Sequence, residues 1–352
     1  MNIAVLVSGG VDSSLALKLL KDQGHTVTAF YLKIWLEDEL AYMGDCPWET
    51  DLAYVKAVCE QLQVPLNVVS LQKEYWDRVV SYTIAQVKKG KTPNPDMLCN
   101  QQVKFGAFLD HIDASFDKIA SGHYAQVIHQ DGKAVLQTAP DLIKDQTYFL
   151  SYLSQEQLSR LMFPIGHLDK QQVRALAQEY NLPNKDRKDS QGICFLGKIS
   201  FDEFLQHHLG IQEGNLIEQE TGTVVGKHNG FWFYTIGQRR GIRLAGGPWY
   251  VVGKDANANI VYISRHYYSE EKKRDALLVS ECNWISGKAP QKDELFVKLR
   301  HGAKKYPCSI GYNADGSLSL QLREHDQGIA AGQFAAFYDG DQCLGSGIIQ
   351  SF

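Results

Sequence analysis

Apolar positions divide the first two hundred residues into short continuous runs and longer stretches with helical spacing. Residues 3–7 are an apolar run typical of a buried strand, and the mostly apolar residues 27–34 indicate a second strand, whereas leucines recur about one helical turn apart in 13–23. The predicted strands are 3–7, 27–34, 66–69 and 118–120, and the predicted helices are 13–23, 51–62, 75–88, 101–111 and, around an irregular stretch, 154–209. Strands that alternate with helices are typical of a parallel α/β sheet.

The pattern changes after residue 210. Glycines and short β-type runs dominate from there to residue 352, and this spacing favours a small barrel or sandwich. We therefore predict an α/β fold in which a parallel-sheet, Rossmann-like domain over 1–201 is followed by a small β-rich central domain over 202–266 and a C-terminal β-barrel over 267–352.

Composition and charge limit the possible partners. The 352 residues are 44% apolar, carry a net charge of −4 and include no run of 18 apolar residues, so we expect no membrane span. The first residues lack the basic start and cleavage site of a secretory signal, so we expect a cytoplasmic protein. Binding to a nucleic acid would rest on local basic clusters, namely 88–91, 185–188, 238–240, 272–274 and Arg300 with Lys304 and Lys305.

The seven cysteines indicate reactive thiols rather than a disulfide framework. Their number is odd and no Cys-x-x-Cys pair is present, so neither a set of disulfides nor a zinc ribbon is predicted. Those expected in the core, within apolar helix-like or strand-like segments, are Cys59, Cys282, Cys308 and Cys343. Cys46, Cys99 and Cys194 lie outside such segments, and Cys46 is given no role.

The stretch "SGGVDSS", residues 8–14, joins the first predicted strand to the first predicted helix. Backbone N–H groups at a helix N-terminus lack partners and carry a positive dipole, and a glycine pair lets an anion approach them. The turn is not a Walker A loop, because no lysine follows the glycines until Lys18, and it lacks the G-x-G-x-x-G spacing. We therefore predict a phosphate-binding turn.

Two cysteines lie in surroundings that change thiol chemistry. "TPNPDMLCN" places Cys99 at the entrance of a helix predicted to begin near Asn100. The helix dipole there favours the thiolate, whereas Asp96 raises the pKa of the thiol, and the sequence leaves open which effect dominates. Cys194 lies in "DSQGICFLG", after the cations of residues 185–188, which also favour a thiolate.

These motifs carry a family resemblance. "SGGVDSS" resembles the PP-loop of the ATP pyrophosphatases, which hold the β,γ-pyrophosphate of ATP and form adenylated intermediates. Six motifs, "SGGVDSS", "TPNPDMLCN", "SGHYA", "KDQTYFL", "DSQGICFLG" and "TIGQRRG", stand in the order seen in the tRNA-specific 2-thiouridylases. The chain is therefore similar to that family over essentially its whole length.

The resemblance implies a tRNA-modifying enzyme that uses ATP and Mg²⁺. Adenylation of O2 of the wobble uridine (position 34), followed by attack of a persulfide sulfur, would release AMP and give 2-thiouridine. Cys194 would carry the persulfide, Cys99 would be the second thiol and Asp96 the acid or base. A sulfur-relay protein would deliver the sulfur, and we expect the enzyme to act as a monomer.

The resemblance also implies the binding residues. The ATP site would comprise Leu6, Val7, Ser8, Gly9, Gly10, Val11, Asp12, Ser13, Leu32 and Gly122, with Asp12 on Mg²⁺. The residues that would contact tRNA are Asn94, Pro95 and Asp96 around the target base, and His123, Lys144, Asp145, Gln146, Arg300, His301 and Gln333 elsewhere.

Three other functions remain open from the residues alone. A different PP-loop ligase or amidotransferase would need no paired cysteines. A thiolase could use an iron–sulfur cluster held by Asp96, Cys99 and Cys194 instead of a persulfide. A non-catalytic tRNA-binding protein would retain the nucleotide turn only as a relic, and the intact motif argues against it. Asp12 could also serve only as a helix cap.

Overall fold

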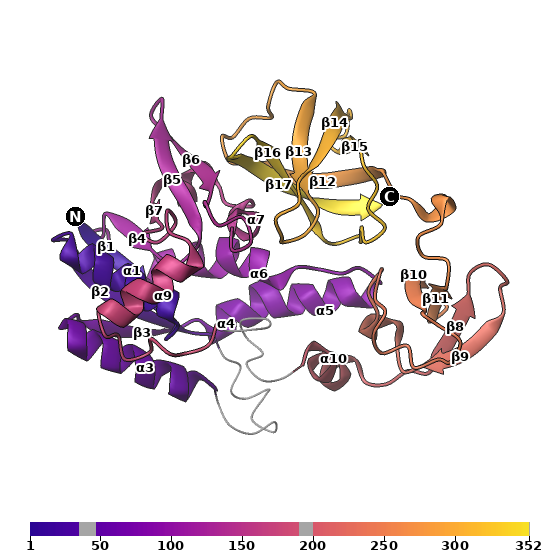
Figure 1. Cartoon of the computed structure of the whole chain (residues 1–352), viewed down its shortest axis with the longest axis horizontal. Helices are drawn as coiled ribbons and strands as arrows, with labels where there is room; N and C mark the ends of the chain where they lie inside the picture. The colour runs from indigo at the N-terminus through magenta and orange to yellow at the C-terminus, as the bar shows by residue number, and fades with distance from the viewer. Residues whose placement is uncertain (35–46, 190–199, 352) are drawn as a thin grey trace.

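The computed structural model describes residues 1–34, 47–189 and 200–351 (Figure 1). Cys46 and Cys194 lie outside the described residues. Three domains follow one another along the chain: a parallel sheet covered by helices, a small four-stranded sheet and a barrel. Within the part of the chain that is described, no helix is long and apolar enough to span a membrane.

A five-stranded parallel sheet forms the N-terminal half, as the alternation of strands and helices predicts. Its strands, in the order in which they pair, are β3 (Leu66–Ser70), β2 (Thr26–Lys33), β1 (Asn2–Leu6), β4 (Lys118–Ala120) and β7 (Leu161–Met162). The two faces of β1 enter different cores: Ile3 and Val5 pack in one cluster, and Ala4 and Leu6 in another. This alternation is the two-residue period of a strand that is buried on both sides.

Helices cover both faces of this sheet. On one side α1 (Val11–Asp22) and α3 (Pro47–Leu62) pack on Ile3 and Val5 through residues such as Leu17 and Val58. On the other side lies a helical run made of α4 (Gln72–Tyr75), a π-helical segment (Trp76–Val80) and α5 (Ser81–Lys88), which replaces the helix predicted over 75–88. In Figure 1 this run extends beneath the barrel toward the central domain.

Two sequence predictions for this half were wrong in detail, and one hairpin was missed. The helix expected over 101–111 begins earlier and consists of α6 (Pro95–Leu98), a π-helical segment (Cys99–Lys104) and a 3₁₀ turn (Ala107–His111). The stretch 154–209, expected to be helical around an irregular segment, also includes a strand. It contains α8 (Gln155–Ser159), β7, α9 (Lys170–Glu179) and α10 (Phe201–Leu209). A hairpin of β5 (Ala125–Gln130) and β6 (Lys133–Thr138), followed by the short α7 (Thr147–Leu150), was not predicted.

The small central domain is a four-stranded sheet with its own core. Its strands pair in the order β10 (Tyr250–Asp255), β11 (Ile260–Ser264), β8 (Gly214–Glu218) and β9 (Val224–His228). Leu216, Val251 and Val261 pack with Phe231 and Trp249. The β-rich texture of this region therefore gives a sheet, as predicted.

Six antiparallel strands form the C-terminal barrel, which the sequence also predicts. They are β12 (Ala276–Trp284), β13 (Glu294–Lys298), β14 (Tyr306–Tyr312), β15 (Leu318–Leu322), β16 (Phe334–Asp339) and β17 (Gln342–Ser351). Pairing of β12 with both β15 and β17 closes the barrel. The hairpin β5–β6 adds to this sheet where Leu136 pairs with Cys343, so the first half of the chain contributes strands to the last domain.

Candidate active site

The predicted phosphate turn lies at the point where the order of the parallel strands reverses. β2 and β3 lie on one side of β1, and β4 and β7 on the other. In open parallel sheets the crevice at the carboxyl ends of two such strands is the usual ligand site. Gly9 has a φ of +79°, a conformation that favours glycine, and Gly10 caps α1 without a side-chain hydrogen bond, so the first N–H groups of the helix face this crevice.

Serine hydroxyls fix the conformation of the turn. Ser13 Oγ accepts a hydrogen bond from Ser8 N at 3.2 Å and donates one to the Gly10 carbonyl at 3.1 Å. Ser14 Oγ donates to the same carbonyl at 3.0 Å. The turn is therefore held in shape by its own side chains, which leaves the backbone N–H groups at the start of α1 for an anion.

Asn184, which the sequence analysis did not single out, and Arg187, which it placed only in a basic cluster near Cys194, support the turn from outside. Asn184 Nδ2 donates to the Gly9 carbonyl at 2.7 Å and to Ser14 Oγ at 2.9 Å. Arg187 Nη1 donates to the same carbonyl at 3.1 Å and its guanidinium forms an ion pair with Asp51. The sequence marks 185–188 only as a basic cluster, and no local signal shows that this segment returns to the turn.

Gly122 closes the crevice on the β4 side. A Cβ atom at this position would lie 2.6 Å from Ser13 N and 2.7 Å from the carbonyl carbon of Asp12, distances that real Cβ contacts do not reach. The backbone after β4 therefore approaches the start of α1 as closely as only glycine allows. Around the same edge Leu6, Val7 and Val11 are buried, and Leu32 is half-buried near the end of β2.

The Asp12 carboxylate belongs to a charged cluster. It accepts hydrogen bonds from the Tyr124 hydroxyl at 2.9 Å and from Lys170 Nζ at 2.7 Å. Lys170 also pairs with Asp189 at 2.8 Å. Burial opposes ionisation of Asp189, but hydrogen bonds from Lys170 and Lys144 outweigh it and lower the pKa of that carboxyl. Tyr124 and Lys170 are further site residues that the sequence analysis missed.

The structure moves Cys99 away from the helix entrance where it was predicted. Asn94 caps α6, with its Oδ1 accepting from Met97 N at 3.4 Å, and Pro95 is the first helical residue. Cys99 therefore lies beyond the first turn, where the dipole effect on a thiolate has largely faded. Its side chain has no exposed surface and packs in the core with Met97 and Val103.

Next to Cys99 the helix carries polar atoms without partners. Asp96 Oδ1 and Asn100 Oδ1 are buried and, within the described residues, accept no hydrogen bond. Asn100 Nδ2 donates to the Phe149 carbonyl at 3.1 Å, which fixes the orientation of that amide. Buried acceptors are rarely left unpaired in native proteins, so these two oxygens are suited to a ligand that donates hydrogen bonds.

The barrel docks on the loop that leads into this helix. Thr92 N donates to the Ala331 carbonyl at 2.8 Å, and Gln333 Nε2 donates to the Thr92 carbonyl at 2.8 Å. Lys91 Nζ donates to Gln350 Oε1, also at 2.8 Å. Backbone and side chains of the C-terminal domain thus hold the "TPNPD" segment in place.

Comparison with known proteins identifies the family. Residues 1–198, 202–265 and 274–349 match the family models described as "tRNA methyl transferase HUP domain", "tRNA methyl transferase PRC-barrel domain" and "Aminomethyltransferase beta-barrel domain". The chain is 47% identical over 357 residues to a protein of Parabacteroides distasonis, 46% over 359 to one of Porphyromonas gingivalis and 46% over 356 to one of Bacteroides thetaiotaomicron, each alignment covering 99% of both chains. All three relatives are named tRNA-specific 2-thiouridylase MnmA.

The chain belongs to the tRNA-specific 2-thiouridylase family.

The positions expected to contact tRNA in this family fall into two groups. Asn94 and Asp96 are half-buried on either side of the buried Pro95, and Asp96 carries one of the unpartnered oxygens described above. Lys144 is half-buried and pairs with Asp189 at 2.9 Å. Arg300, with half of its side chain exposed, pairs with Asp326. These residues lie on or next to accessible surface.

The second group has hydrogen-bond, ionic or stacking partners within the protein, although His301 is exposed and only Asp145 is buried. Asp145 has no exposed surface and pairs with the buried Lys298 at 2.7 Å, which joins the first domain to the barrel. Gln146 Oε1 accepts from Tyr124 N at 2.9 Å, and the His301 ring stacks on Phe149 with centroids 4.8 Å apart. With the amide of Gln333, these side chains have structural partners in this conformation, which the sequence analysis did not foresee.

His123 lies between the phosphate turn and the helix that carries Cys99. Its Nδ1 is 2.8 Å from Ser121 Oγ, and its ring packs on Phe105 and Phe163. Burial lowers the pKa of His123 to about 3, and the charge of Lys104 acts in the same direction. The imidazole is therefore neutral at physiological pH.

Proposed function

We propose that this protein catalyses the ATP-dependent 2-thiolation of the wobble uridine of tRNA. The observation that carries the proposal is the joint presence of a preformed anion turn at the sheet crevice and a helix with Asp96, Cys99 and unpaired acceptor oxygens. Relatives that share 99% of its length are named for this reaction. A substrate present in the cytoplasm agrees with the expected location there.

ATP binds with its phosphates on the turn. N–H groups of residues 9–13 at the start of α1 donate to the phosphates, and Gly122 leaves room beside them. The carboxylate of Asp12 supplies the oxygen donors that Mg²⁺ prefers, and the ion, when bound, neutralises phosphate charge. Lys170 donates to both Asp12 oxygens and also pairs with Asp189, so it would keep Asp189 as a partner if Asp12 bound the ion.

Asn94, Pro95 and Asp96 receive the uracil. A uridine N3–H is a hydrogen-bond donor, and the unpaired Asp96 Oδ1 is an acceptor suited to it. Adenylation turns O2 into part of a good leaving group, because AMP departs more readily than oxide. Recognition of a base splayed out of a single-stranded loop is the usual mode of sequence-specific RNA binding.

Sulfur transfer then uses two thiols. The terminal sulfur of a Cys194 persulfide attacks C2, the C2–O2 bond breaks and AMP leaves. The Cys99 thiolate attacks Sγ of Cys194, so that a Cys99–Cys194 disulfide forms and the 2-thiouridine is released. An external thiol reductant restores both cysteines, and a sulfur-relay protein reloads Cys194. We infer that the enzyme acts as a monomer, with both cysteines of the reaction in one copy of the chain.

Nucleoside mass spectrometry tests this proposal. Unmodified tRNA is incubated with the protein, ATP, Mg²⁺ and a persulfide donor, in parallel with Cys194→Ala and with Cys282→Ser as the matched control. We expect 2-thiouridine from the wild type and the control and none from Cys194→Ala. Thiolation by Cys194→Ala would exclude the persulfide on that residue, and AMP release without any thiolated base would indicate another PP-loop ligase.

A further inference from the structure

The central domain contains an acid-free segment that the proposed reaction does not use. Residues 221–254 include five cations and no Asp or Glu. The cations are Lys227, Arg239, Arg240, Arg243 and Lys254. Lys227 forms an ion pair with Glu213, and Lys254 donates to the Tyr234 carbonyl. The three arginines lie on the loop between β9 and β10, are exposed, and form no ion pair with any described carboxylate.

The loop that carries these arginines is held in one conformation. Gln238 Oε1 accepts from Thr235 N at 2.9 Å, and Gln238 Nε2 donates to the Arg240 carbonyl at 3.0 Å. Two backbone hydrogen bonds with Val251, at 2.8 and 3.0 Å, tie the loop to β10. A loop fixed in this way loses little conformational entropy when its arginines bind a ligand.

An aromatic side chain is exposed beside the arginines. Tyr250, Tyr267 and Tyr268 pack on one another, with centroids of 4.7 to 5.8 Å, and Tyr268 is 69% exposed. A hydrogen bond with Tyr250 raises the pKa of Tyr268, and the charge of Arg239 acts in the opposite direction, so Arg239 lies within electrostatic reach of that phenol. Tyr268 therefore presents a supported aromatic face next to unpaired positive charge.

This surface is continuous with the barrel. A Cβ atom on Gly237 would lie 2.8 Å from the Tyr267 hydroxyl and 3.7 Å from Gly328, and a Cβ on Gly328 would lie 2.7 Å from Arg300 Nη1. Arg300 is a position expected to contact tRNA. The loop, Tyr267 and Arg300 thus follow one another across the junction of the two domains.

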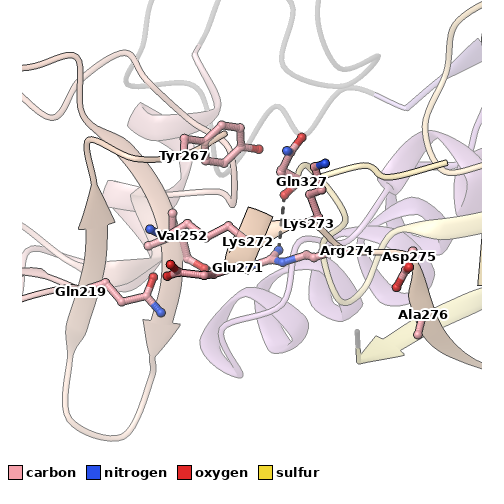
Figure 2. A pocket seen from close by; sticks show the side chains of 10 residues that line it. All are labelled: Gln219, Val252, Tyr267, Glu271, Lys272, Lys273, Arg274, Asp275, Ala276 and Gln327. Carbon is pink, nitrogen blue, oxygen red and sulfur yellow. Dashed lines mark hydrogen bonds between the residues drawn. The ribbon is translucent and has the colours of Figure 1, made fainter. Parts of the chain in front are cut away.

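Arg274 fixes this junction. Its guanidinium donates to the Val252 carbonyl of the central domain at 2.9 Å and to the Ile329 carbonyl of the barrel at 3.0 Å. Figure 2 shows Arg274 between the two domains, with Tyr267 and Gln327 on the wall of the same pocket. The arginine loop therefore has a defined position relative to Arg300.

We propose that Arg239, Arg240, Arg243 and Tyr268, the arginine–tyrosine surface, form a second tRNA contact outside the site of the target base. The proposal rests on the proposed function, because it takes tRNA as the substrate. Exposed arginines without carboxylate partners bind phosphate oxygens in two-pronged geometry, and an exposed ring offers a stacking platform for an unpaired base. The surface supplies local positive charge in a chain whose net charge is −4.

Salt-dependent binding of tRNA tests this surface. Fluorescence anisotropy with labelled full-length tRNA is measured from low to moderate salt for the wild type and for the triple variant Arg239→Ala, Arg240→Ala, Arg243→Ala. Each lost phosphate contact lowers the slope of log K against log salt by about 0.7 to 0.9. We expect the triple variant to bind at least about tenfold more weakly, with a slope smaller by about 2.

Two matched variants separate charge from stacking. Lys227→Ala removes a cation of the same domain that already has a carboxylate partner, and we expect neither affinity nor slope to change. Tyr268→Ala is expected to weaken binding about fivefold without changing the slope, and Tyr268→Phe to retain wild-type affinity. Circular dichroism of each variant confirms that it is folded.

Unchanged affinity and slope in a folded triple variant would overturn the proposal. If that variant instead lost binding of a persulfide-carrying protein, the surface would be a docking site for the sulfur donor and the proposal would again be wrong. Failure of the wild-type protein to bind any tRNA would overturn the proposed function itself. The two failures are therefore distinguishable in one set of titrations.

Discussion

The carbonyl of Gly9 accepts hydrogen bonds from Asn184 and Arg187, whereas the Cys99 thiol lies among apolar side chains with no exposed surface. The nucleotide turn is complete without a ligand, since its shape comes from its own serines and from a distant segment. The thiol has to become accessible before it can meet a second sulfur. The comparison teaches that adenylation uses a preformed site, while sulfur transfer requires a rearrangement that exposes Cys99. Until that rearrangement, burial shields the thiol from water.

Loss of the Cys99 thiol should have the largest effect, and it should affect sulfur transfer but not adenylation. We expect Cys99→Ser to lower formation of 2-thiouridine at least about a thousandfold, because no second thiol can release the product. Release of pyrophosphate that depends on tRNA should persist, because the nucleotide turn is untouched. Parallel assays of nucleoside and pyrophosphate measure both. Cys282→Ser, a half-buried barrel thiol, is the control, and equal loss of pyrophosphate release in Cys99→Ser would contradict the separation.

Removal of Lys298 should loosen the barrel and spare the nucleotide turn. Lys298→Met leaves the buried Asp145 carboxylate without its cation, which costs about 3–5 kcal/mol of the free energy of unfolding. Urea titration measures this cost, and ATP titration of the folded variant should give wild-type affinity. Lys292→Ala breaks a surface pair with Asp339 and should cost about 0–1 kcal/mol. A similar small cost for Lys298→Met would show that the buried pair does not hold the two domains together.

A methyl group at Gly122 should weaken ATP binding and leave the Cys99 helix unchanged. Its Cβ would collide with the first turn of α1, so Gly122→Ala should raise the Kd for ATP about 10- to 100-fold, or about 1.4–2.7 kcal/mol. Isothermal titration with ATP measures the change. At Gly311 an added Cβ meets nothing closer than 3.6 Å, so Gly311→Ala should bind ATP normally. Wild-type affinity in Gly122→Ala would place the nucleotide elsewhere.

His123 lies between the nucleotide turn and the Cys99 helix, and its effect on stability should be absent near pH 7 and grow as the pH falls. Its pKa is about 3 in the folded protein and about 6.5 in an unfolded chain. Between these values the unfolded state binds the extra proton, so this residue makes stability fall as the pH decreases, by at most about 1.4 kcal/mol per pH unit. Thermal unfolding from pH 7 to 4 should therefore show a weaker pH dependence for His123→Asn than for the wild type. Parallel profiles would mean that His123 is not buried as a neutral ring.

The sequence predicted the elements whose signals are local. The apolar run at 3–7 and the glycine turn after it give β1 and α1, and the change of texture after residue 210 gives two β units. Two errors could have been avoided from the same kind of signal. Asn94 followed by Pro95 is a typical helix start, and Asp131-Gly132 between alternating apolar residues is a typical hairpin turn, here that of β5 and β6.

Other features of the site depend on partners far along the chain. Asp145 lies in a polar loop motif that reads as surface, and its burial follows from Lys298, 153 residues away. The support of the turn by Asn184 is of the same kind, since 175 residues separate it from Gly9. Periodicity and local motifs carry no information on such distant pairs. The sequence could therefore mark these polar residues as candidates, but it could not show which residues they contact.

The shared sheet of the barrel has a consequence for the newly synthesised chain. β6 pairs with β17, and the hydroxyl of Thr138 reaches Asp341, 203 residues further on. At 5–20 residues per second, a ribosome needs about 10–40 s to make that span. During this interval the edge of β6 that later pairs with β17 has no neighbouring strand. An unpaired strand edge can pair with strands of other chains. Completion of the barrel sheet therefore competes with aggregation during synthesis. Chaperones that cover exposed strands should raise the yield of folded enzyme.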